Sequence, residues 1–187
     1  MKLKLKDPGS AITHGIAMLL AVAGATPLIV KAARSADILH VFAVSVFILT
    51  MILLYLASTL YHSVNSTVKV NRRLKKMDHM MIFVMIAGCW INCPKWLSSV
   101  IYIGMGWLCV LAFVPIFHNL PRAGFGWLLA GGIIYTIGGV IYALKLPIFN
   151  AKHKNFGSHE VFHIFVMLGS VCHFVVMYFF VAGMGIH

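Results

Sequence analysis

The chain has 187 residues, of which 61% are hydrophobic and only 10% are charged. A soluble domain carries roughly 25% charged residues, so this chain has too little polar surface to cover itself in water. Its 15 basic and 4 acidic residues give a net charge of +11, but the basic residues lie between apolar runs. That placement indicates membrane topology and contact with anionic lipid rather than nucleic-acid binding. We therefore expect a single integral membrane domain over residues 1–187, with membrane lipid as its partner and no nucleic acid.

The apolar runs predict transmembrane helices, which need roughly 20 residues each to cross the hydrocarbon core. Five runs are long enough and a sixth is short: the long runs are 11–30, 40–61, 97–117, 125–144 and 160–182, and the short run is 79–93. The first run follows a basic N-terminus but is longer than the apolar region of a signal peptide, so it is interpreted as a span. The predicted fold is an all-α, polytopic transmembrane helical bundle.

The basic residues also predict which loops are cytoplasmic. The N-terminus, the segment 62–78 and the loop 145–158 are the most basic connections, so all three should lie in the cytoplasm. Two cytoplasmic loops must be separated by an even number of crossings, yet three apolar segments lie between residues 78 and 145. Either the short segment does not fully cross, or the charge rule fails for one loop.

Histidines gather at the ends of the apolar runs, beside two of the four acidic residues. Ser58 and His62 close the second run and are four residues apart, hence on one helix face. His159 and His163 open the last run with the same spacing, which lets two imidazoles bind one metal ion from adjacent turns. A third histidine from another helix would complete a three-histidine zinc site whose fourth position stays open, as in catalytic zinc sites.

Asp78 opens the short segment and would act there as a base or orient the bound water, whose pKa zinc lowers to about 7. Spacing alone leaves open whether the three histidines share a metal at all. The remaining histidines have simpler interpretations: His14, His40, His118, His153 and His187 are predicted to be interfacial residues with satisfied rings, and His173 to bond a neighbouring helix. Glu160 is rotated away from His159 on the helical wheel, so we expect it beside the ligands or in solvent.

Several sequence motifs resemble those of the haemolysin III family, the bacterial relatives of the adiponectin and progestin receptors. The matching segments are S-A-I-T-H-G (10–15), L-Y-L-A-S-T-L-Y-H-S (54–63), D-H (78–79), I-A-G (86–88), Y-I-G-M-G-W (102–107), L-L-A-G-G-I-I-Y-T-I-G (128–138) and H-E-V-F-H-I-F-V-M-L-G-S-V-C-H-F (159–174). The last motif, combined with the earlier S-x-x-x-H, is specific, and the resemblance covers most of the chain.

The resemblance implies a seven-helix fold with a cytoplasmic N-terminus in the bacterial inner (plasma) membrane. It also implies zinc held by His62, His159 and His163, with Ser58 and Asp78 associated. The wider superfamily contains ceramidases, so it suggests a zinc-dependent hydrolase of a lipid amide or ester. The family name suggests instead a membrane-lytic, pore-related protein, and the receptor relatives suggest a regulatory protein with structural zinc.

One departure from the family concerns the topology. Only the segment from Cys89 to Ile101 separates the I-A-G motif from the Y-I-G-M-G-W motif, so the family's fourth helix is missing here. Losing one helix should invert everything downstream and carry His159 and His163 roughly 30 Å from His62, across the hydrocarbon core. We therefore expect that 79–95 returns to its starting side, or that 79–117 crosses only once in net. A degenerate copy without function is the alternative.

Overall fold

The structure is a computed structural model that describes residues 5–34, 38–84, 116–144 and 157–183. All the regular structure in these ranges is helical, as the sequence predicts. The elements are α1 (Pro8–Ala33), α2 (Ile38–Ser63), α3 (Val68–Val84), α5 (Arg122–Leu144), α7 (Ser158–Val175) and a π-helical continuation of α7, Val176–Val181.

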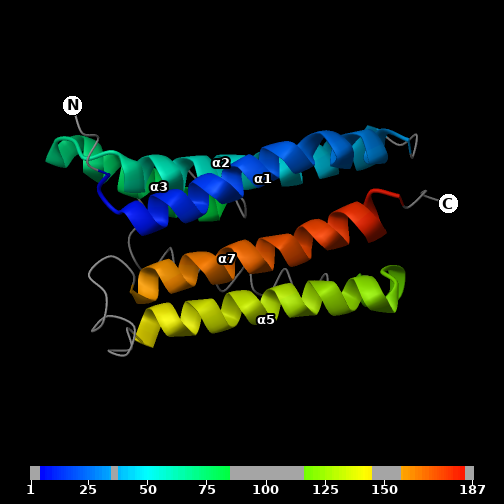
Figure 1. The fold of residues 1–187 in the computed structure, drawn as a ribbon. Helices are drawn as coiled ribbons and strands as arrows, with labels where there is room; N and C mark the ends of the chain where they lie inside the picture. The colour runs from blue at the N-terminus through cyan, green and yellow to red at the C-terminus, as the bar shows by residue number, and fades with distance from the viewer. Residues whose placement is uncertain (1–4, 35–37, 85–115, 145–156, 184–187) are drawn as a thin grey trace.

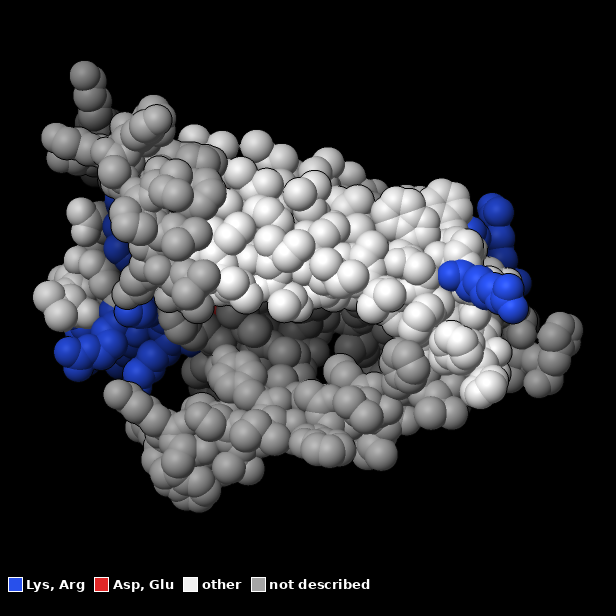
Figure 2. Space-filling model, turned by 90° about the horizontal axis from the view of Figure 1, so that it is seen from below, with Lys and Arg blue, Asp and Glu red and all other residues white. Residues whose placement is uncertain are grey.

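Four of these helices are long and apolar enough to cross a membrane: Pro8–Ala33, His40–Ser63, Arg122–Tyr142 and Ser158–Val181. They correspond to four of the five long runs, while the run 97–117 lies almost wholly outside the described residues. Large apolar side chains cover their outer surfaces; Leu19 is 63% exposed and Leu20 60% exposed. Figure 2 shows the lysines and arginines gathered at the two ends of the molecule, with a band of uncharged side chains between them. This distribution is that of an integral membrane protein.

The helices form two antiparallel pairs, α1 with α2 and α5 with α7, and α7 joins the pairs by packing against α1 (Figure 1). Small residues allow the close approach of α5 and α7: a Cβ atom on Gly138 would lie 2.5 Å from Phe165, and one on Gly169 would lie 2.6 Å from Tyr135. Glycine at such contacts is typical of helix packing in lipid, where close van der Waals contact replaces the hydrophobic effect.

The two ends of the bundle differ in composition. At one end, which we call the histidine end, α1 and α7 begin and α2 and α5 end. The Asp7 amide donates to the His62 carbonyl there at 2.9 Å, and the Tyr142 ring lies 5.5 Å from the His159 ring. At the opposite end, the Lys31 ammonium lies 4.5 Å from the centre of the Tyr178 ring.

Helix α3 corrects the prediction that 62–78 is a loop, because residues from Val68 onward are helical. Its sequence is amphipathic: Asn71, Leu74 and Asp78, at a spacing of three and four, are partly buried, while the basic residues Lys69, Arg72, Arg73 and Lys76 are exposed on the other face. The Thr67 hydroxyl accepts a hydrogen bond from the Val70 amide at 3.4 Å, as an N-cap residue does. The density of basic residues in this segment therefore does not distinguish a loop from an amphipathic helix.

The structure also bears on the number of membrane crossings between residues 78 and 145. Asp78 interacts electrostatically with His14 and His159, so it lies at the histidine end. Helix α5 begins at the opposite end, where a Cβ atom on Gly124 would lie 2.9 Å from Phe180. The chain between Asp78 and Arg122 therefore changes sides, and α5 brings it back. How residues 85–115 make that passage lies outside the described residues.

Candidate metal centre

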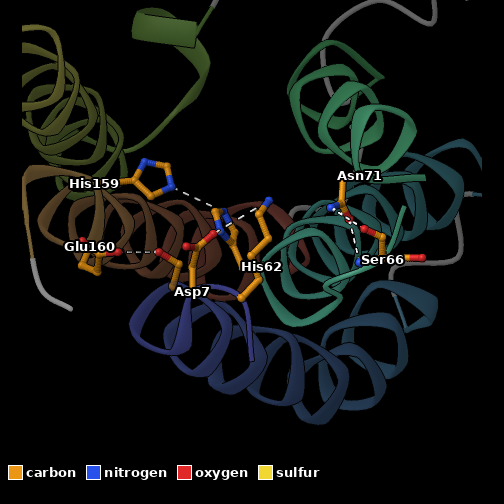
Figure 3. A network of polar contacts seen from close by, with 8 residues as sticks. Asp7, His62, Ser66, Asn71, His159 and Glu160 are labelled. Atoms are coloured by element: carbon orange, nitrogen blue, oxygen red, sulfur yellow. Dashed lines mark hydrogen bonds and ion pairs between the residues drawn. The ribbon is translucent and has the colours of Figure 1, made fainter. Parts of the chain in front are cut away.

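Three histidines from two helices meet at the histidine end. His62 comes from the last turn of α2, and His159 and His163 come from the first two turns of α7. One nitrogen from each ring lies within 4.8 Å of the other two. Figure 3 shows His159 directed toward His62, with their Nε2 atoms 3.4 Å apart. The structure thus brings together all three residues that the sequence predicts as ligands.

Asp7 orients the ring of His62. Its Oδ2 lies 3.0 Å from His62 Nδ1, and a carboxylate can only accept, so Nδ1–H is the donor (Figure 3). This bond fixes the tautomer and leaves Nε2, on the His159 side, with a free lone pair. Metal-binding histidines in proteins are held by a carboxylate or a carbonyl in this way. Asp7 is not predicted from the sequence, because nothing in its spacing links it to a residue 55 positions away.

Glu160 fixes the start of α7. Its Oε2 accepts the Gly157 amide at 2.7 Å. Its Oε1 accepts the Ser10 hydroxyl at 2.9 Å, which is the bond drawn from Glu160 in Figure 3. The first bond caps the helix that carries His159 and His163, and the second joins that helix to α1. Glu160 is therefore beside the ligands, one of the two positions expected for it. The Ser10 hydroxyl is a second contributor that sequence reasoning missed.

The His62–His159 pair has the nitrogen spacing of a zinc site. Two nitrogen ligands of a tetrahedral zinc ion lie roughly 3.3 Å apart, since each Zn–N bond is about 2.0–2.1 Å long. The observed 3.4 Å between the Nε2 atoms of His62 and His159 matches that spacing and is longer than an ordinary N–H···N bond. His163 is 3% exposed and its Nδ1 has no hydrogen-bond partner among the described residues, although buried polar groups rarely lack one.

Ser58 and Asp78, the two predicted catalytic residues, lie near this centre. Ser58 is 3% exposed on α2, one turn before His62. Asp78 is partly buried on α3, and its charge acts on His159. Their roles in catalysis stay predictions.

Two of the interfacial histidines differ from expectation. His14 is 5% exposed on α1, and neither of its ring nitrogens has a hydrogen-bond partner among the described residues. His40 likewise has an unpaired Nε2, in the first turn of α2. The prediction of satisfied rings is therefore wrong for both residues. His173 contacts a neighbouring helix, with its ring 5.2 Å from that of Tyr135 on α5.

An apolar cavity of about 250 Å³ lies between α1, α2 and α7. Its lining includes Ala17, Ala21 and Gly24 of α1, Tyr55 of α2 and residues of α7 around Ser170. The Tyr55 hydroxyl donates to Ser170 Oγ at 2.6 Å. The Tyr55 ring lies edge-on to His14, with the ring centres 5.2 Å apart, so the cavity adjoins the histidine cluster.

Comparison with known proteins identifies the class. The chain matches the family model described as "Haemolysin-III related" over residues 3–93 and 89–174. It is 32% identical to Hemolysin-3 of Bacillus cereus, an alignment that covers 94% of this chain and 92% of that protein. The chain therefore belongs to the haemolysin III family.

Two further relatives extend the comparison. Hemolysin-3 homolog of Bacillus subtilis is 31% identical, with 94% of each chain covered. The adiponectin receptor protein of Drosophila melanogaster is 38% identical over 61 residues, which is 31% of this chain and 14% of that protein. No solved structure shows a significant match.

The alignments also locate the difference from the family. The family model matches in two pieces that overlap at residues 89–93, inside the segment where a helix is predicted to be missing. The alignment with the Bacillus cereus protein has 211 positions although it uses 94% of a 187-residue chain, so that relative carries a few tens of residues without counterparts here. As one continuous segment, that number of residues would suffice for one crossing.

Proposed function

We propose that this protein is a zinc-dependent membrane hydrolase that acts on a lipid amide or ester. The observation that carries the proposal is the meeting of three imidazole nitrogens within 4.8 Å at one end of a membrane bundle. His62, His159 and His163 would hold the metal, and three protein ligands leave one position for water or substrate. Zinc, when bound, acts as a Lewis acid and makes water a better nucleophile near neutral pH.

The residues around the centre have distinct tasks in this proposal. Asp7 holds the His62 ring so that its Nε2 faces the other ligands. Asp78, whose charge acts on His159, accepts a proton from the attacking water and orients it. Ser58 lies one turn below His62 and donates a hydrogen bond to the water or to the substrate carbonyl.

The choice of a lipid substrate rests on the surroundings of the centre. The adjoining cavity between α1, α2 and α7 is lined almost entirely by apolar atoms, and its volume is about 250 Å³. Such a space suits an acyl chain, since binding pockets are mainly apolar with few polar groups that fix orientation. An amide or ester at the head of the chain would then lie near the histidines.

The sidedness of the centre is also a proposal. The described lysines and arginines number six at the histidine end, Lys6 and the five on α3, and three at the opposite end, namely Lys31, Arg34 and Arg122. The positive-inside rule then places the histidine end and the N-terminus in the cytoplasm, as in a bacterial inner membrane. Membrane-impermeant thiol labelling of Val70→Cys and Arg34→Cys from each side tests this. Labelling of Val70→Cys from outside the cell contradicts it.

The central experiment measures metal and activity together. Protein purified in detergent should contain zinc in a stoichiometric amount, and His118→Ala, at an exposed histidine of the opposite end, should keep it. The His159→Ala/His163→Ala variant should lose the metal. Hydrolysis of a lipid amide should stop after chelation and return when zinc is added. Turnover that survives exhaustive chelation would contradict a zinc hydrolase.

A second candidate is a regulatory protein in which zinc is structural. It is favoured by the way the centre joins α1, α2 and α7 through the Asp7–His62 and His62–His159 contacts. In that case chelation lowers thermal stability while no hydrolysis is found in the metal-loaded protein. A lytic function, as the name of the relative Hemolysin-3 suggests, predicts vesicle leakage that persists in His163→Ala.

A further inference from the structure

His14 is a buried polar group that the proposed reaction does not yet use. It is 5% exposed, and both ring nitrogens lack a hydrogen-bond partner among the described residues. A neutral imidazole carries one donor and one acceptor, so both are without a partner here. Proteins rarely leave such groups unpaired, so both ring nitrogens are open to a partner from outside the described residues.

The position of His14 links the metal centre to the cavity. Its ring stacks on His163, with the ring centres 3.7 Å apart and the planes inclined by 10°. The ring of Tyr55, a residue of the cavity lining, lies edge-on to it with the ring centres 5.2 Å apart. His14 therefore stands between the three-histidine cluster and the apolar cavity.

The cavity starts at Ala17, one helix turn beyond His14, and follows the same face of α1. Ala17, Ala21 and Gly24 succeed His14 at spacings of three, four and three residues, which places all four on one helix face. The small side chains of Ala17, Ala21 and Gly24 leave a slot that runs roughly 10 Å along the helix axis. A Cβ atom on Gly24 would lie 2.9 Å from Phe174, so that aromatic ring bounds the slot at its far end.

The polar groups near the cavity differ in whether they have hydrogen-bond partners. Tyr55 and Ser170 are bonded to each other at 2.6 Å, and Tyr135 also lies 2.9 Å from Ser170 Oγ. His14, one helix turn before the cavity lining, has a donor and an acceptor position that are unpaired among the described residues. An amphiphile whose chain fills the slot would therefore place its polar group against the His14 ring and next to His163.

We propose that His14 is a substrate-binding residue, which hydrogen-bonds the amide or ester group of a single-chain acyl ligand. The acyl chain lies in the slot along Ala17, Ala21 and Gly24, and His14 directs the carbonyl toward the three-histidine centre. This inference rests on the proposed hydrolase function and adds to it the substrate class, a compound with one medium-length chain, and the residue that positions it.

The experiment separates binding from turnover by using decanoyl hydroxamate, an acyl compound with a zinc-binding head. Its affinity is measured calorimetrically on the full-length, zinc-loaded protein in lipid nanodiscs. His14→Phe keeps the ring stack on His163 and removes both nitrogens, and His14→Gln restores a donor and an acceptor. His40→Phe is the matched control, since His40 also has an unpaired Nε2 but lies at the start of α2, at the opposite end.

We expect His14→Phe to bind the hydroxamate about tenfold more weakly while it keeps its zinc. His14→Gln should recover most of the affinity, and His40→Phe should bind as the parent protein does. If His14→Phe fails to fold, His14→Leu, which also lacks ring nitrogens, makes the same comparison.

Three results would overturn the assignment: unchanged affinity in His14→Phe, loss of zinc in that variant, or no hydroxamate binding to the parent protein. Failure of the hydrolase function has a different signature. In that case the hydroxamate binds and His14→Phe weakens it, but no amide or ester is cleaved. Conversely, cleavage together with unchanged affinity in His14→Phe leaves the hydrolase standing and removes His14 from substrate binding.

Discussion

Asp7 offers the sharpest test of the metal centre, because it lies outside the ligand set and its carboxylate bonds one of the ligands directly. Its Oδ2 accepts the Nδ1–H of His62 at 3.0 Å, while its backbone amide donates to the His62 carbonyl at 2.9 Å. The substitutions Asp7→Ala and Asp7→Asn alter only the first of these bonds. The backbone bond survives in both variants, so the entry of the chain into α1 should stay in place.

The expected loss of zinc affinity follows from the contact between Asp7 and His62. Partners that orient a ligating histidine are worth about 10- to 100-fold in metal affinity. The Asp7 side chain is 42% exposed, so solvent screens part of its charge and the lower end of that range applies. We expect Asp7→Ala to bind zinc about tenfold more weakly, or about 1.4 kcal/mol, and Asp7→Asn to lose less, since its amide oxygen still accepts a hydrogen bond.

The assay is a competition for zinc against a chromogenic chelator at fixed pH, in detergent. Lys6→Gln is the control: its ammonium lies 3.9 Å from the same Asp7 oxygen, at the limit of an ion pair, and the zinc affinity should be unchanged. Zinc binding of parental strength in Asp7→Ala would falsify the argument that the carboxylate prepares His62 for a metal. An equal loss of thermal stability in the metal-free protein would assign the contact to folding instead.

The remaining predictions concern packing, capping and protons. Gly169→Ala should destabilise the bundle by about 1–3 kcal/mol in detergent unfolding, because the new Cβ meets the Tyr135 ring at 2.6 Å. Gly132→Ala, which meets nothing within 4 Å, should be neutral or slightly stabilising in the same assay. Glu160→Ala removes the cap on the Gly157 amide and should cost about 1 kcal/mol of stability, read from the same unfolding curves. Zinc affinity should fall on acidification, because an imidazole must be deprotonated to bind the metal; affinity that stays constant as the medium is acidified would argue against histidine ligands.

Much of the fold follows from the sequence because the bilayer imposes a simple rule. A helix must carry an apolar run of about 20 residues to cross, and four such runs became the four long helices of the described chain. The spacing of His159 and His163 is equally local: four residues on a helix place both rings on one face. The meeting of these rings with His62 needed the structure, because it depends on which ends of α2 and α7 share a side.

His14 and Asp7 show where such prediction fails. Each is a lone residue whose importance comes from helix packing, and no local period connects it to its neighbours at the centre. His14 lies against His163 because α1 packs on α7, and Asp7 reaches His62 because α1 begins where α2 ends. The prediction for the basic helix α3 fails for another reason. Its charges mark the membrane surface, but they do not distinguish a loop from an amphipathic helix there.

The connection between Asp78 and Arg122 is another feature that the local sequence does not decide. A chain that simply lost one crossing would carry His159 and His163 away from His62, since every later helix would be inverted. In the structure, α5 starts at the opposite end and α7 starts at the histidine end, so the passage between Asp78 and Arg122 changes sides as a single crossing would. Both expected arrangements, in which 79–95 returns to its starting side or 79–117 crosses once in net, give this change of side. The three imidazoles share one end despite the shorter chain, and the case for a working centre rather than a degenerate copy depends on that parity.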